Sequence, residues 1–320
     1  QGRLQAGRGI IMKELIAKMP KELRYVETLV LCLVLAVILI TPLRIGGYGY
    51  LPGDDALRHS AKVVSDKNWD EILILRDGIE MDSHPGWHAI LGSIYRLTNW
   101  QPDSLVFFSF STLFILFCLV PVFTFDRPEA WIASLLAAAV FNFTLIYRLV
   151  LGRPYIFTMA VVLFMCLIWP KLRTKKTPFL AFSGLTFAIA LSTWIHCSWY
   201  LFALPVFSFF LAREWRVAFR ITFAAAAGIM IGACLTGNPF QFFQETFLHA
   251  VRAFDGHPLQ RTLVTEFQPF SGDAKTVLVV SVMLIWRRVR GGWDKGVIDN
   301  PVFFLAASGW ALGFIAFRFW

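Results

Sequence analysis

The chain has 320 residues, of which 57% are hydrophobic and 16% are charged, and its mean hydropathy is +0.61. This composition excludes a soluble domain, because apolar blocks of about 17–25 residues, the length that crosses a bilayer, recur along the chain. The formal net charge is +9, but basic residues in such a protein first report its orientation in the membrane. The sequence therefore predicts an all-α polytopic membrane protein with no nucleic-acid partner.

Hydropathy predicts about nine spans within one transmembrane domain, 25–320. A polar tail, 1–24, precedes it and is expected in the cytoplasm. Within this tail, 1–11 come before the first methionine, Met12, and are expected to be non-native. The last apolar block reaches Trp320, so we expect a chain truncated at its C-terminal end. The expected spans are 25–43, 103–124, 130–150, 155–169, 178–195, 198–212, 217–236, 276–287 and 300–317.

The connections between the spans differ on the two faces. With the N-terminus in the cytoplasm, the short basic connections at 171–176, 213–220 and 287–290 all lie inside, as the positive-inside rule requires. The two long connections, 44–102 and 236–275, then lie outside. A protein with elaborate loops on one face only is expected to work on that face.

The external connections are expected to contain helices. Leu57, Ala61 and Val64 are spaced at i, i+4 and i+7, so 55–66 is predicted to form an amphipathic helix on the membrane surface. Two further helices are predicted at 85–97, with Trp87 and Leu91 on its apolar side, and at 240–254.

An acidic pair, Asp54 and Asp55, stands directly before the first of these helices. One aspartate there would cap the helix by accepting hydrogen bonds from its first backbone N–H groups. Two adjacent carboxylates close to lipid headgroups are costly unless they are used, so we expect one to act as a catalytic base. Glu266, in an aromatic segment of the second long connection, is either a solvated side chain or a second active-site carboxylate.

Histidines accompany these acids. His59 follows Asp55 by four residues, which suits either an ion pair or a shared substrate contact. His84 and His88, with Asp82, have a spacing found in metal sites, but a proline and a glycine between them disturb the regular helix. We therefore favour hydrogen bonding to substrate or loop packing and assign no metal ligand, although a divalent metal cofactor is left open. The five cysteines lack CxxC spacing, which indicates neither a zinc cage nor a disulfide framework.

Arg148 and Arg153 depart from the positive-inside pattern, since both fall at the external end of a helical hairpin. Snorkelling to the interface is one explanation. A guanidinium group also grips a lipid phosphate well through two parallel hydrogen bonds. His196 lies at the next external turn, where it would face the same cavity as the acids. All three are therefore candidate substrate-binding residues.

Together these motifs resemble a known family. An external loop that opens with Asp54 and Asp55, a following His-Pro helix at 84–88, and Arg153 before a proline at the start of a later span look like the GT-C membrane glycosyltransferases. Within them, the chain is most similar to the branch of protein O-mannosyltransferases and aminoarabinose transferases. Many members have Asp-Glu and His-Pro-Pro where this chain has Asp-Asp and His-Pro-Gly, so the resemblance does not imply one acceptor.

The resemblance implies transfer of a sugar from a polyprenyl-phosphate-linked donor to an acceptor on the non-cytoplasmic side. It also implies an enzyme of the bacterial inner or plasma membrane, in contact with membrane lipids. The general base would be Asp54, or Asp55 if the register differs by one. The substrate-binding residues would be drawn from His59, His84, His88, Arg148, Arg153, His196 and Glu266.

Two other functions compete with this assignment. A lipid or small-solute transporter or flippase would need charged residues near the bilayer midplane and two related halves, neither of which the sequence shows. A non-catalytic membrane subunit would use the same scaffold without its chemistry.

Overall fold

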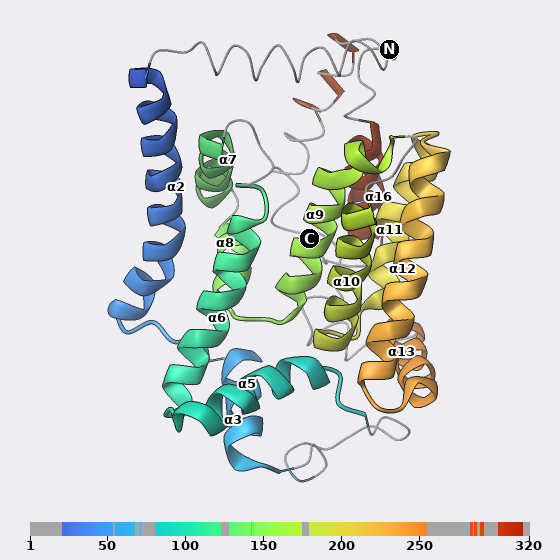
Figure 1. Ribbon diagram of the computed structural model, residues 1–320. Coiled ribbons are helices and arrows are strands. Elements are labelled where there is room, and N and C mark those ends of the chain that lie inside the picture. Colours follow the sequence, from blue (N-terminus) through green and yellow to red (C-terminus); the bar gives the residue numbers. More distant parts are fainter. Residues whose placement is uncertain are drawn as a thin grey trace.

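The structure is a computed structural model that describes residues 21–53, 55–67, 71, 81–122, 128–141, 143–174, 179–254, 282–283, 285–286, 289–290 and 300–315. Every element assigned within these residues is helical, which confirms the predicted all-α class. Long helices stand side by side, and shorter helices close one end of the bundle, at the bottom of Figure 1.

The bundle and its closed end consist of different helices. The bundle contains α2 (Lys21–Gly47), α6 (Pro102–Leu119), α7 (Pro128–Phe141), α8 (Phe143–Val150), α9 (Tyr155–Leu172), α10 (Phe179–Ile195), η1 (Trp199–Phe202), α11 (Ala203–Leu211), α12 (Trp215–Leu235) and α16 (Asn300–Ile315). The closed end, called the α3/α5 end below, contains α3 (Asp55–Ser65), α5 (Pro85–Thr98) and α13 (Pro239–Phe254).

Four helices, α2, α6, α9 and α12, are long and apolar enough to cross a membrane. This supports an integral membrane protein but does not confirm nine spans. The segment predicted as one span, 130–150, contains α7 with 14 residues and α8 with 8, and each is shorter than the roughly 20 residues that cross a bilayer. The predicted span 276–287 lies largely outside the described residues.

The contact between α10 and α12 is made by small residues. Gly228 and Gly232 lie one turn apart on α12. A Cβ atom at Gly228 would lie 2.7 Å from the carbonyl oxygen of Thr186, and one at Gly232 would lie 2.6 Å from that of Ala190. Glycines at this spacing let two helix backbones approach closely, which gives helices in lipid much of their attraction.

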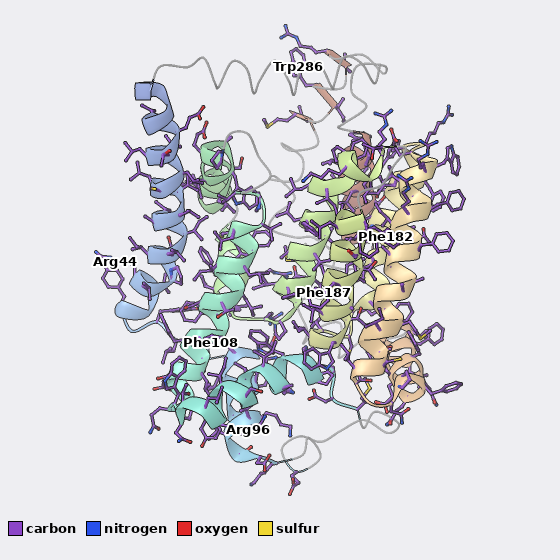
Figure 2. All side chains as sticks on the ribbon, viewed as in Figure 1. Arg44, Arg96, Phe108, Phe182, Phe187 and Trp286 are labelled. Carbon is purple, nitrogen blue, oxygen red and sulfur yellow. The ribbon has the colours of Figure 1, made fainter. Side chains whose placement is uncertain are left out.

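Large apolar side chains cover the outside of the bundle (Figure 2). Leu33 of α2 is 57% exposed, Phe187 of α10 is 64% exposed and Phe223 of α12 is 68% exposed. Exposed apolar surface of this extent is unusual for a protein in water. It is the surface expected of helices that face lipid tails.

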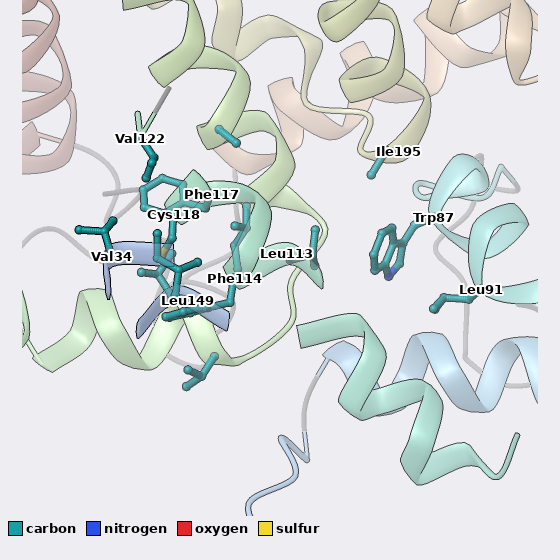
Figure 3. Close-up of a cluster of buried hydrophobic side chains, with 14 residues drawn as sticks. Val34, Trp87, Leu91, Leu113, Phe114, Phe117, Cys118, Val122, Leu149 and Ile195 are labelled. Carbon is teal, nitrogen blue, oxygen red and sulfur yellow. The ribbon is translucent and has the colours of Figure 1, made fainter. Parts of the chain in front are cut away.

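A buried apolar cluster attaches α5 to the bundle (Figure 3). Trp87 and Leu91 of α5 are 2% and 0% exposed, and the cluster that contains them includes Leu113 of α6 and Ile195 of α10. Burying a side chain of this size away from water contributes about 1.5–3 kcal/mol. The predicted helix 85–97 and its apolar face are thus confirmed, and they fix α5 at the end of the bundle.

Candidate functional site

Helix α3 confirms the predicted amphipathic helix, and its buried face carries a histidine. Ala56, His59 and Ser60 are buried, whereas Leu57 of the predicted apolar stripe is 42% exposed. α3 packs against α5 and α6. This contact turns His59 inward and leaves the apolar stripe on the outer side of the helix.

The start of α5 places two more histidines beside α3. His84 is the N-cap residue and Pro85 begins the helix, a position where its missing N–H group costs nothing. Asp82 Oδ1 accepts a hydrogen bond from the backbone nitrogen of His84 at 2.9 Å. A Cβ atom at Gly86 would lie 2.5 Å from the ring of Trp194, so only glycine allows α5 to lie this close to the end of α10.

A carboxylate and two imidazoles form a chain between α5 and α3. His88 Nδ1 lies 2.5 Å from Asp82 Oδ2, and His88 Nε2 lies 2.7 Å from His59 Nδ1. A carboxylate only accepts, so His88 donates from Nδ1. When both rings are neutral, His88 Nε2 accepts from His59 Nδ1, and the unprotonated nitrogen of His59 is Nε2. Asp82 thereby sets the tautomers of both rings.

His84 and His196 extend this group of rings. The His84 ring centroid lies 4.7 Å from that of His59 and 5.0 Å from that of His196. Burial, followed by the neighbouring His88 and Arg58, lowers the pKa of His59 to about 3. Burial and the adjoining histidines also lower the pKa of His84 well below its usual value. These two imidazoles are therefore neutral at pH 7 and can exchange hydrogen bonds with hydroxyl groups. The name histidine cluster is used below for His59, His84, His88 and His196.

Asp55 joins two arginines at the first turn of α3. Arg153 Nε lies 2.9 Å from Asp55 Oδ2, and Arg58 pairs with Asp55 Oδ1. The side chain of Asp55 is 16% exposed, so it points into the protein rather than into water. Gly152, in the turn between α8 and α9, has a φ of +69° and packs against Ala56, which brings Arg153 to the start of α3.

Arg148 approaches the histidine cluster from another direction. It lies in the last turn of α8 and hydrogen-bonds the hydroxyl of Tyr155. The Tyr155 ring centroid is 6.1 Å from that of His196. Arg148 thus contacts Tyr155, which lies beside His196. Arg153 pairs with Asp55, which lies one turn from His59 on α3.

A cavity of about 200 Å³ opens beside the cluster on the side of α13. Burial raises the pKa of the Cys197 thiol in its wall, so this cysteine stays protonated and is a poor nucleophile. Glu245 of α13 is 7% exposed and also lines the cavity. The lining is Met81, Ser83, His84, His196, Cys197, Ser198, Tyr200, Glu245 and Thr246.

The candidate residues named from the sequence divide into three groups. Asp54 and Glu266 lie outside the described residues. The cavity described above is lined by His84 and His196. The others with a described position do not line it, namely Asp55, His59, His88, Arg148 and Arg153.

Two residues that sequence reasoning did not select also belong to the site. Asp82 was considered only as a metal ligand, although an aspartate two residues before the cap of a helix commonly bonds the backbone. Glu245 was not considered. Its signal was the spacing of four residues from Gln241 on the predicted helix 240–254, because Gln241 Nε2 donates to Glu245 Oε1 at 2.7 Å.

The histidine cluster does not have the geometry of a metal centre. Within the described part of the chain, no three His, Cys, Asp or Glu side chains are arranged to hold a metal ion. Both ring nitrogens of His88 are directed at Asp82 and His59 rather than at a common point.

Comparisons with protein-family models, curated proteins and solved structures found no match to the chain. The α3/α5 end nevertheless has a distinct chemistry, with neutral imidazoles, carboxylates and guanidinium groups together at one end of the membrane helices. Such a site can bind an anionic group and form hydrogen bonds with hydroxyl groups.

Proposed function

We propose that the protein transfers a glycosyl group from a polyprenyl-phosphate donor to an acceptor at the α3/α5 end of the bundle. We place this end on the non-cytoplasmic face, because that orientation keeps the short basic connections inside. The resemblance of the sequence to the GT-C glycosyltransferases supports this proposal.

The observation that carries the proposal is the ion pair of Asp55 and Arg153 beside the histidine cluster. Asp55 pairs with Arg153 at 2.9 Å from Nε, and a guanidinium has five N–H donors, so this ion pair is compatible with contact to a phosphate. His59 lies one turn from Asp55 on α3. A phosphate bound at Arg153 would thus lie close to imidazoles that can bind hydroxyl groups.

Each group has a role in the proposed reaction. Arg153, with Arg148, stabilises the negative charge on the departing polyprenyl phosphate. Asp54 removes the proton from the acceptor hydroxyl, and that oxygen forms the new bond to the anomeric carbon as the bond to the phosphate breaks. Asp55 positions Arg153, since each of its oxygens already pairs with a guanidinium group. The neutral imidazoles of the histidine cluster orient sugar or acceptor hydroxyls.

The distribution of charge disfavours the transporter alternative. In α6, α9, α10, α12 and the described part of α2, every Asp, Glu, Lys and Arg lies in the first two turns or the last turn of its helix. An ion or solute path would need such groups near the middle of the membrane. The charged groups of these helices lie instead near the helix ends.

The proposal is tested with the purified chain in liposomes. Mass spectrometry identifies the lipid that co-purifies, and polyprenyl-phosphate-linked sugars labelled in the sugar then serve as donors. We expect the label to move to an acceptor with release of polyprenyl phosphate. Absence of turnover with every such donor, together with flux of an intact lipid or solute across the liposome, would replace the transferase by a transporter.

A further inference from the structure

The cavity beside the histidine cluster is a small chamber, and its wall on α13 has no role in the reaction described above. Its walls are the segment 81–84, the segment 196–200 and one face of α13. The backbone nitrogen of Cys197 donates to the carbonyl oxygen of Ser83 at 3.3 Å, which joins the first two walls. Trp199 Nε1 donates to Thr246 Oγ1 at 2.9 Å, which joins the second wall to α13.

Glu245 is a carboxylate fixed in the wall of this chamber. Its Oε2 accepts from the backbone nitrogen of Met81 at 2.8 Å, and its Oε1 accepts from Gln241 Nε2 at 2.7 Å. Burying a carboxylate is expensive unless hydrogen bonds compensate. A carboxylate has about four acceptor positions on its two oxygens, and these two bonds hold Glu245 in place at the chamber wall.

Hydroxyl groups and imidazoles surround this carboxylate. Ser83, Ser198, Tyr200 and Thr246 supply hydroxyls to the lining, and His84 and His196 supply rings. The low pKa of His84 keeps that ring neutral, so it both donates and accepts. Neutral donors and acceptors around one carboxylate suit a ligand with several hydroxyl groups.

The volume limits what can bind. The chamber of about 200 Å³ holds the equivalent of about seven water molecules at roughly 30 Å³ each, which is close to the volume of a single pyranose ring.

We propose that this chamber binds one monosaccharide ring and that Glu245 accepts hydrogen bonds from its hydroxyls. The inference rests on the proposed function, because it names the part of the site that holds sugar. The same ring chemistry has two sources, the glycosyl group of the donor lipid and a sugar on the acceptor. The chamber adjoins the phosphate position through the histidine cluster, so either ring could reach the reacting centre from it.

The test measures binding of a panel of methyl glycosides to the full chain in lipid nanodiscs. Saturation-transfer NMR should detect binding of at least one of them to the wild type. Glu245→Gln keeps the shape of the side chain but removes its charge, and charge-assisted hydrogen bonds are worth roughly 10- to 100-fold in affinity. We expect a loss of that size. The matched control is Glu214→Gln, because Glu214 pairs with Arg173 outside the chamber, and its affinity should equal that of the wild type.

Ser83→Trp provides a second test in case Glu245→Gln folds poorly. Ser83 has an exposed side chain at the chamber wall, so Ser83→Trp should fill the space, preserve the thermal unfolding midpoint and abolish methyl glycoside binding. Failure of every methyl glycoside to bind the wild type would overturn the proposal. Wild-type affinity in both Glu245→Gln and Ser83→Trp would overturn it as well.

Steady-state kinetics separate the two sources of the ring and separate this inference from the proposed function. If Glu245→Gln raises the KM for the donor, the chamber holds the transferred sugar. If it raises the KM for the acceptor, the chamber holds a sugar of the acceptor. Glycoside binding that depends on Glu245, without transfer from any polyprenyl-phosphate donor, would keep the chamber and remove the transferase. Transfer with wild-type KM values for both substrates in Glu245→Gln would keep the transferase and remove the role of the chamber in binding sugar.

Discussion

The contact between α10 and α12 and the α3/α5 end of the bundle are held together by different interactions. In the first, Gly228 and Gly232 bring two apolar helices into backbone contact. In the second, short hydrogen bonds connect His88 with Asp82 and with His59, and the bond to His59 joins α5 to α3. This difference indicates which region determines the stability of the fold and which determines the reaction. We expect changes in the first region to unfold the protein, and changes in the second to alter its reaction while the fold persists.

The largest effect is expected for the base at the α3/α5 end. Asp54→Asn should lower the transfer rate about 100- to 10,000-fold, because asparagine still caps a helix but cannot take a proton. Expression and donor binding should be nearly unchanged. Rates of label transfer in liposomes measure the effect.

Asp55→Asn is the control for this variant. It should reduce the rate less and raise the donor KM, because Arg153 loses its ion pair. Full activity in Asp54→Asn together with failure of Asp55→Asn would shift the base by one residue. Activity in both variants would exclude this mechanism.

At the α10/α12 contact we expect a substitution to lower the stability of the fold. Gly232→Leu should destabilise the fold by about 3 kcal/mol, because even a Cβ atom would lie 2.6 Å from the carbonyl oxygen of Ala190. The thermal unfolding midpoint in detergent should fall. Gly184→Ala, on α10 with open space around its Cβ, should be neutral or slightly stabilising. Equal midpoints for the two variants would show that backbone contact is not what holds these helices.

Arg153 tests the phosphate position. Arg153→Ala should weaken binding of the polyprenyl-phosphate lipid roughly 10- to 100-fold, the value of a charge-assisted hydrogen bond. Arg153→Lys should recover part of this affinity, since it keeps the charge but loses the planar fork. Lipid binding measured by native mass spectrometry compares the three proteins. Unchanged affinity in the alanine variant would indicate an arginine that only snorkels to the interface.

The α3/α5 end should also respond to pH. The folded pKa of His59 is about 3, below the value of about 6.5 for an exposed histidine. Between these values the unfolded chain binds the additional proton, so stability is full above pH 6.5 and falls as the pH drops. Between pH 6.5 and pH 5 this one residue should cost about 2 kcal/mol. Thermal unfolding of the wild type should show the loss, and His59→Gln should reduce it. An identical pH dependence in His59→Gln would mean that His59 does not contribute.

The smallest change in energy is expected for Asp82→Asn, which should nevertheless invert the tautomers of the chain. The side-chain oxygen would still accept from the backbone nitrogen of His84, so the NH₂ group would face His88 Nδ1. His88 would then accept at Nδ1 and donate from Nε2, and His59 would carry its proton on Nε2. Nitrogen-15 NMR of labelled histidines distinguishes the two tautomers. Unchanged spectra in Asp82→Asn would show that this carboxylate does not set them.

Local patterns predicted the helices of the site better than the sides they bury. The proline at position 85 and the spacing of Trp87 and Leu91 were enough to place α5. For α3 the pattern gave the helix, but its apolar stripe did not show that His59 lies on the side packed against α5. That orientation depends on contacts between segments far apart in sequence.

The same limit applies to the site. The histidines were selected by type and position, but their hydrogen bonds depend on where α5 meets α3 and on the turn at His196. Glu245 was missed because an acid on an amphipathic helix usually faces water, and only the contact of α13 with Met81 buries it. Hydropathy predicted one span over 130–150, where the structure has the separate helices α7 and α8, because hydropathy does not report where a helix ends.

The contact of Gly86 with Trp194 also determines how a ligand could enter the chamber. It fixes the start of α5 to the end of α10 without room for movement, and the bond of Cys197 to Ser83 locks the segments beside it. The remaining wall, α13, is joined to α12 through Gly237, whose φ of +88° marks a sharp bend. Because the cavity is already open to the outside, we expect sugars to enter without a movement of α13. A crosslink from α13 to the segment 81–84 should therefore leave the exchange of a free sugar unchanged.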